Sequence, residues 1–266
     1  MKLDVIRANP AGNMTLFVLT SVEKELRAKI AEKLLAIPEL AAEQVGYRCE
    51  PDPGYDGRME MAGGEFCGNA SRAYGMLIAK ERGIEETEET VQLTLQVSGS
   101  DTPVEIEADM EAGTSRAKMP LPQMVCRRTA GGVSGILVHL GGIAHFVVDD
   151  VIPSETFFEQ AEKEIFSGMT GLDAYGVMFY DSASGKLIPL VKVPAANSLY
   201  WEGSCGSGSL ATVIAQTEGA PDWKYAMDLV QPAGTVRAEV ERVGGRVTEA
   251  YIGGDVTFDP PMQIEI

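Results

Sequence analysis

Two short segments of the chain each place a cysteine directly before a glycine and a small polar residue. The first reads Cys67-Gly68-Asn69 and the second reads Cys205-Gly206-Ser207, and an apolar stripe at helical spacing follows each of them. The segments lie about half the chain length apart, which is the signature of an internal repeat. The sequence therefore predicts two similar domains, each with one cysteine at the N-terminus of a helix.

This position has consequences for the chemistry of a thiol. The first turn of a helix carries four unpaired N–H groups and about half a positive charge. The thiolate forms of Cys67 and Cys205 are therefore expected to be favoured, and their pKa values to fall. The glycine that follows each cysteine lets the backbone approach a ligand, and the exposed N–H groups can hold a carboxylate.

Two helix ends of this kind, facing each other, would hold one carboxylate and place a sulfur on each side of the adjacent carbon. One thiolate would remove the α-proton from one face, and the opposite thiol would deliver a proton to the other face. This chemistry inverts an amino-acid α-carbon without a cofactor. The alternative for either cysteine alone is a buried structural residue in a glycine-rich turn, and the matched pair argues against it.

Composition narrows the classes of partner. The 266 residues suffice for two domains, and 22 Lys and Arg against 39 Asp and Glu give a net charge of −17. This charge argues against nucleic acid and anionic membrane partners. No signal peptide or membrane span is recognised, so a cytoplasmic protein is expected. With two histidines and no Cys-x-x-Cys pair, no metal site is expected, and Cys49 and Cys126 are interpreted as core residues.

Periodicity predicts how the chain is organised around the two cysteines. The predicted domains are 1–120, to which a strand at 254–266 returns, and 121–253. Helices are expected at 22–37, after Cys67, at 154–166 and after Cys205. Strands are expected at 15–20, 59–62, 91–97, 104–108, 135–140, 145–148, 177–181, 186–193, 235–240 and 247–252.

At these residues the sequence resembles the diaminopimelate epimerase superfamily, which also holds proline racemases and pyridoxal-independent histidine racemases. The similarity covers Cys67-Gly68-Asn69-Ala70 and Cys205-Gly206-Ser207-Gly208. It is supported by Ala11-Gly12-Asn13, Gly142-x-x-His145 and Gln231-Pro232-x-Gly234. These motifs run along the whole chain in the order expected for that superfamily.

The resemblance implies a fold of the α/β (α+β) class, as in diaminopimelate epimerase: two similar domains, each a β-barrel-like sheet around a central helix. The site would lie between the domains, with Cys67 acting on the L substrate and Cys205 on the D substrate. His145 would assist the first cysteine, the alternative being a structural histidine at a strand start. The implied substrate-binding residues are Asn13, Gly68, Asn69, Gly206 and Ser207.

Departures from the superfamily pattern bear on the substrate. Diaminopimelate epimerases hold a distal amino-carboxylate with several asparagines and one arginine. The corresponding segments read Gly142-Ile143-Ala144-His145, Ala174-Tyr175 and Ala196-Asn197 in this chain. A distal carboxylate without a charged partner is costly to bury, so a neutral or cationic side chain is expected instead.

The residues before each cysteine are most similar to those of histidine racemases that feed metallophore synthesis. Glu60 and Glu202 are the candidates to receive an imidazole or ammonium group, although Glu202 could instead orient Cys205. The expected partner is a small molecule, the amino-acid substrate, and no cofactor is expected. The sequence leaves the oligomeric state open, a homodimer included.

Two other interpretations stay open. One is an epimerase of the same superfamily that acts on diaminopimelate, proline or another amino acid. The other belongs to a different class, a non-catalytic amino-acid-binding or redox protein in which the two thiols form a disulfide on oxidation.

Overall fold

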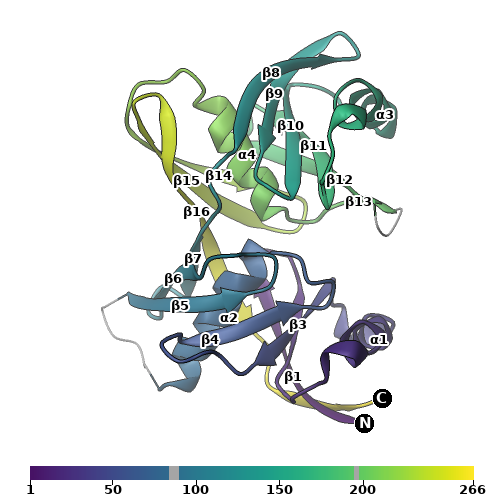
Figure 1. Cartoon of the computed structure of the whole chain (residues 1–266), viewed down its shortest axis with the longest axis vertical. Coiled ribbons are helices and arrows are strands. Elements are labelled where there is room, and N and C mark those ends of the chain that lie inside the picture. Colours follow the sequence, from purple (N-terminus) through teal and green to yellow (C-terminus); the bar gives the residue numbers. More distant parts are fainter. Residues whose placement is uncertain (84–89, 195–197) are drawn as a thin grey trace. The chain divides into compact units, whose positions relative to one another are not determined.

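The computed structural model describes residues 1–83, 90–194 and 198–266. The chain has a mixed α+β fold and divides into two compact units (Figure 1). The first unit contains Met1–Lys118 and Gly253–Ile266, and the second contains Met119–Ile252. The sequence-based boundaries at 120/121 and 253/254 fall close to these.

The first unit is an eight-stranded barrel around one helix. Strands β1 to β7 follow one another around the barrel, and the C-terminal part of β16 pairs with both β7 and β1 and closes it. The elements are β1 (Lys2–Pro10), β2 (Thr15–Val18), α1 (Lys24–Leu35), η1 (Pro38–Leu40), β3 (Gln44–Cys49), β4 (Gly57–Met61), α2 (Gly68–Glu81), β5 (Val91–Val97), β6 (Val104–Asp109), β7 (Thr114–Lys118), β17 (Met262–Glu265) and, from Gly253 on, β16 (Arg246–Phe258), whose earlier residues belong to the second unit.

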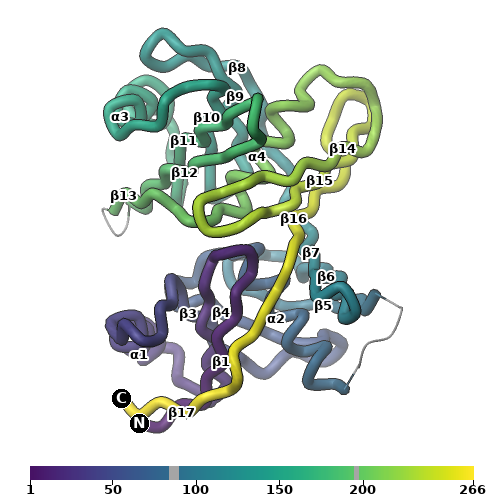
Figure 2. Tube along the Cα trace, turned by 180° about the vertical axis from the view of Figure 1, so that it is seen from behind, coloured from purple at the N-terminus to yellow at the C-terminus, as the bar shows by residue number. Residues whose placement is uncertain are grey.

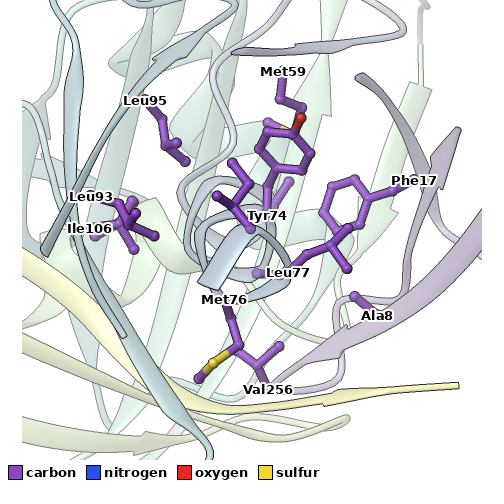
Figure 3. Packing of buried hydrophobic residues seen from close by; sticks show 14 of the residues in the cluster. Ala8, Phe17, Met59, Tyr74, Met76, Leu77, Leu93, Leu95, Ile106 and Val256 are labelled. Carbon is purple, nitrogen blue, oxygen red and sulfur yellow. The ribbon is translucent and has the colours of Figure 1, made fainter. Parts of the chain in front are cut away.

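Helix α2 fills the barrel of the first unit. Every residue from Gly68 to Ala79 is buried, the polar Asn69, Ser71 and Arg72 included, so the barrel covers all sides of this part of the helix. Figure 3 shows apolar side chains of the surrounding strands meeting those of the helix. The helix passes so close to β6 that a Cβ on Gly75 would lie 2.6 Å from Cγ2 of Ile106. A glycine at this position is therefore what allows the close packing.

The second unit pairs its strands in the order β8, β9, β10, β11, β12, β14 and β15, and β13 also pairs with β12. Helix α4 packs on this sheet with its residues from Gly208 to Ile214 buried. The elements are β8 (Met124–Ala130), β9 (Val133–His139), β10 (Ile143–Asp149), α3 (Glu155–Glu164), η2 (Phe166–Gly168), β11 (Ala174–Asp181), β12 (Lys186–Val193), β13 (Ser198–Trp201), α4 (Gly206–Gln216), β14 (Lys224–Val230) and β15 (Thr235–Val243).

The two units repeat one order of connections. In the first, α1 joins the parallel strands β2 and β3, and α2 joins the parallel strands β4 and β5. In the second, α3 joins the parallel strands β10 and β11, and α4 lies between the parallel strands β12 and β14. The second helix of each pair carries a cysteine at its N-terminus, so one topology builds both cysteine sites.

The C-terminal segment returns to the first unit. Figure 2 shows the trace of β16 running on into β17 beside the N-terminal strand. Lys2 of β1 pairs with Glu265 of β17 in antiparallel register, and the two chain ends lie together. Among the described helices, none is long and apolar enough to cross a membrane.

Candidate active site

Cys67 is the N-cap residue of α2. Its backbone is extended, with φ −129° and ψ 107°, and its Sγ accepts a hydrogen bond from the backbone N–H of Ala70 at 3.4 Å. The hydroxyl of Ser71 donates to the carbonyl oxygen of Cys67 at 2.8 Å. The sulfur thus takes the place of the side-chain oxygen that usually caps a helix, and it is held at the positive end of the helix dipole.

Cys205 has the same position in the second unit. It is the N-cap of α4, with φ −118° and ψ 109°, and its Sγ accepts from the N–H of Gly208 at 3.3 Å. The hydroxyl of Ser209 donates to the carbonyl oxygen of Cys205 at 2.7 Å. Both cysteines therefore stand at helix N-termini with the same cap geometry, the placement that the repeated segments predict.

The first N–H groups of both helices are available to an anion. Within the described part of the chain, the backbone N–H groups of Gly68, Asn69, Gly206 and Ser207 donate to no protein acceptor. These are the residues that sequence reasoning assigned to a substrate carboxylate, and N–H groups at a helix start are suited to that ligand.

Gln44 contacts Cys67 and was missed by sequence reasoning. Its Nε2 lies 3.4 Å from Sγ of Cys67, and it also donates to Oδ1 of Asn13 at 2.8 Å and to Oγ1 of Thr15 at 2.7 Å. Gln44 begins β3, directly opposite Thr15 in the parallel pairing with β2. An N–H donor at this place stabilises a thiolate, because hydrogen bonds to the charged form favour it.

Asn13 lies beside Cys67, as a member of the same cluster. Its Oδ1 is 3.8 Å from Sγ of Cys67, and its Nδ2 donates to Oε2 of Glu43 at 3.0 Å. The side chain of Asn69 points inward instead, where it is 2 % exposed and accepts from Nε of Arg72 at 3.2 Å. Only the backbone of Asn69 is therefore free to serve a ligand.

The surroundings of Cys205 are more enclosed. Cys205 is 6 % exposed, and its backbone N–H donates to Oε1 of Gln231 at 2.8 Å. Nε2 of Gln231 donates in turn to Oγ of Ser209 at 2.8 Å. The Gln231 side chain thus ties the loop before β15 to the start of α4, which gives the Gln231-Pro232 segment a structural role at this site.

The pKa of Cys205 corrects the expectation that both thiols are acidic. Burial raises the pKa of the Cys205 thiol well above its usual value, and the carboxylate of Glu202 raises it further. Hydrogen bonds from Ser207 and from the N–H of Gly208 oppose this shift without overcoming it. The dipole of a helix end is a smaller effect than the loss of water around a thiolate, so Cys205 is a thiol at neutral pH.

His145 lies beside the second cysteine. Nε2 of His145 is 2.8 Å from Oγ of Ser207, and that Oγ is 3.6 Å from Sγ of Cys205. The assistance to Cys67 that the resemblance implies stays a prediction, because Cys67 belongs to the other unit. Complete burial lowers the pKa of His145 from 6.5 to about 3, so the ring is neutral. Its Nδ1 has no partner among the described residues, which leaves Ser207 as the polar contact of the ring.

The two predicted glutamates differ in their surroundings. The carboxylate of Glu60 is bound by Arg27 on one oxygen and by Arg58 on the other. Burial alone would raise the pKa of Glu60, but the hydrogen bond from Arg58 and the charge of Arg27 outweigh it and lower the pKa. Glu60 therefore has both oxygens engaged, which does not support its prediction as a substrate receptor. Glu202 acts on Cys205, as described above.

The structure says less about the two other cysteines and about the segments that depart from the diaminopimelate epimerase pattern. None of the four cysteines forms a disulfide within the described residues, and Cys49 and Cys126 are half-buried in their respective units. The hydroxyl of Tyr175 donates to Glu162 at 2.6 Å, while Ala196-Asn197 lies outside the described residues. No group of three or more potential ligand residues in the described ranges could hold a metal ion.

Comparison with known proteins places the whole chain in one family. A family model described as the histidine racemase CntK N-terminal domain matches residues 2–259. The chain is 30% identical over 216 residues to a histidine racemase of Fusobacterium nucleatum, covering 79% of each protein. It is 26% identical over 263 residues to a histidine racemase of Staphylococcus aureus, covering 96% of this chain and 94% of that protein.

Solved structures show the same fold at low sequence identity. A hydroxyproline epimerase from Agrobacterium vitis with bound trans-4-hydroxy-L-proline matches with a TM-score of 0.64 and 13% identity, covering 99% of this chain and 92% of the other. A methylitaconate isomerase matches with a TM-score of 0.62 and 12% identity, covering 99% and 95%. The chain belongs to the histidine racemase family that its family model defines, and it is an isomerase of the amino-acid racemase and epimerase type.

Proposed function

We propose that this protein is a cofactor-independent histidine racemase in which Cys67 and Cys205 are the two catalytic bases. One observation carries the proposal: each unit builds a thiol at a helix N-cap next to backbone N–H groups that have no acceptor in the described chain. A carboxylate and an α-proton are the two features of an amino acid that such a pair of sites would engage.

The proposed reaction moves one proton onto sulfur and another off it. For the L substrate, the thiolate of Cys67 takes the α-proton and becomes a thiol. The thiol of Cys205 gives its proton to the opposite face of the α-carbon and becomes a thiolate. Between the two transfers, N–H groups at the helix starts stabilise the charge that develops on the carboxylate. The D substrate follows the reverse path.

Histidine is proposed as the substrate on two grounds. The curated relatives bear that name, and they align with most of the chain. The carboxylate of Glu202, next to Cys205, is an acceptor suited to an imidazole or ammonium group. Diaminopimelate and other amino acids are the alternatives, and the experiment below separates them.

The test is solvent exchange at the α-carbon. Each of the common amino acids and diaminopimelate is incubated with reduced protein in D₂O, and the α-proton signal is followed by NMR. We expect loss of that signal with histidine, together with formation of the opposite enantiomer on a chiral column. Exchange with diaminopimelate alone would reassign the substrate. No exchange with any amino acid would leave a non-catalytic binding or redox protein.

The chain offers matched controls for the thiols. Cys67→Ala and Cys205→Ala should each abolish inversion, whereas Cys49→Ala and Cys126→Ala should keep it, because the last two thiols lie outside the helix caps. Full inversion by either of the first two variants would contradict the proposal.

A further inference from the structure

A buried arginine lies on α2 five residues after Cys67. Arg72 is 0% exposed, and its Nε donates to Oδ1 of Asn69 at 3.2 Å. Its Nη1 donates to the carbonyl oxygens of Gly254 at 2.8 Å and Asp255 at 3.2 Å. These acceptors are all uncharged, and they connect the helix to the returning strand β16.

The charge of this guanidinium has no carboxylate partner. In the described part of the chain, Arg72 forms no ion pair, and its buried Nη2 has no hydrogen-bond acceptor. Removing a charge from water without a counter-ion is costly. A negative charge that forms at the site would therefore compensate it, and the ionisable group that acts most strongly on Arg72 is Cys67.

The second unit shows that this arrangement is not a requirement of the fold. Five residues after Cys205, where α2 has Arg72, helix α4 has the fully buried Leu210. The buried arginine of that unit, Arg242, is instead ion-paired with Glu218 at 3.1 Å and donates to Oγ1 of Thr217 at the end of α4. Among the described residues, one helix start therefore has a buried cation without an ion pair, and the other has no buried cation.

We propose that Arg72 is a positioning residue of the Cys67 site: its charge holds Cys67 as a thiolate, and its Nε fixes the first turn of α2 through Asn69. The proposal rests on the proposed function, because it assigns resting protonation states to the two bases. Cys67 rests as thiolate and Cys205 rests as thiol. The protein is thus ready to accept a proton from substrate at Cys67 and to donate one from Cys205.

Charged groups of both signs lie near the Cys67 site. Among the described residues of the first unit they include Arg72 on α2, Asp255 on β16 and Glu43 before β3, whose carboxylate accepts from Asn13. Burial lowers the pKa of Arg72 to about 10, and the charges of Cys67 and Asp255 counteract this shift. The guanidinium therefore stays protonated throughout the neutral range.

The test is the pH dependence of thiol alkylation, which needs no substrate. The protein is treated with iodoacetamide over a range of pH, and the modified Cys67 peptide is quantified by mass spectrometry. We expect Cys67 to react with a midpoint at least about one pH unit below that of N-acetylcysteine in the same buffers. A midpoint at or above that of N-acetylcysteine would overturn the proposal in the unaltered protein, whatever the variants do.

Three variants separate charge from packing. Arg72→Gln should raise the Cys67 midpoint by about one pH unit, a tenfold loss of reactivity below both midpoints. Arg72→Lys should keep most of the lowered midpoint, because it retains the charge. Arg242→Gln removes a buried arginine from the other unit and should leave Cys67 unchanged. Equal upward shifts in Arg72→Gln and Arg72→Lys would show a purely structural role and overturn the proposal.

Failure of this inference and failure of the proposed function give different results. A low alkylation midpoint that depends on Arg72, in a protein that exchanges no amino-acid α-proton, would support the thiolate at Cys67 and reject the racemase. Racemisation by a protein whose Cys67 has an ordinary alkylation midpoint would support the racemase and reject the thiolate at Cys67.

Discussion

Replacing His145 by glutamine should remove a loss of stability that the unaltered protein shows in mild acid. His145 is 0% exposed in the second unit, and burial lowers its pKa from 6.5 to about 3. The native ring is neutral between these values while the unfolded chain binds a proton. Stability from this group is therefore complete above the unfolded pKa and is lost as the pH falls below it.

The size of the effect follows from the shift. Each pH unit below the unfolded pKa costs about 1.4 kcal/mol while the native ring stays neutral. Between about pH 7 and about pH 5, the unaltered protein should lose about 2 kcal/mol of unfolding free energy through His145 alone. Over the same pH range, the unfolding free energy of the His145→Gln variant should fall by about 2 kcal/mol less than that of the unaltered protein, whatever its stability at neutral pH.

Urea denaturation followed by tryptophan fluorescence measures the unfolding free energy of the second unit of the chain. The two tryptophans, Trp201 and Trp223, both lie in the second unit with His145. His139→Gln, which removes the other histidine of the chain, is the control and should retain the acid-sensitive loss. An equal loss in the unaltered protein and in His145→Gln would refute the assignment of a buried neutral ring.

Three further substitutions should shift thiol reactivity in directions set by the contacts at each cysteine. Ser207→Ala removes a hydroxyl that lowers the pKa of Cys205, so the alkylation midpoint of Cys205 should rise. Glu202→Gln removes a charge that raises the same pKa, so that midpoint should fall, while burial, the larger cause, continues to raise it. Gln44→Met removes the side-chain donor 3.4 Å from Sγ of Cys67, which should raise the Cys67 midpoint and reduce racemase kcat/KM by about tenfold.

Local sequence patterns were enough to predict the two helices that carry the cysteines. An apolar stripe after each Cys-Gly pair predicted α2 and α4, and their repeated spacing predicted two similar halves. Strand β3 was missed because Gly46 interrupts its apolar pattern. A Cβ on Gly46 would lie 3.1 Å from Sδ of Met59, so this glycine reflects close packing that only the folded chain reveals. Gln44 begins that strand and was overlooked with it.

Long-range contacts explain the other differences. The acceptors of Arg72 include the carbonyls at 254 and 255, which no local pattern connects to α2. Glu60 was one of two candidates to receive an imidazole or ammonium group, and its ion pair with Arg27 of α1 was not foreseen. The pKa of Cys205 depends on how deeply α4 is buried, and motif spacing does not report burial. Helix position alone therefore predicts where a thiol stands and not which protonation state it has.

The central claim is that two bases act on opposite faces of the α-carbon. The most direct test is the incorporation of solvent deuterium at low conversion. L-histidine is incubated with the unaltered protein in D₂O, and the reaction is stopped at low conversion. The two enantiomers are separated, and the deuterium content of each is measured by mass spectrometry. Two monoprotic thiols predict a D-histidine product that carries deuterium at the α-carbon and a recovered L-histidine that still carries protium. Protium retained in the product, or deuterium entering the recovered substrate as fast as product forms, would contradict the account.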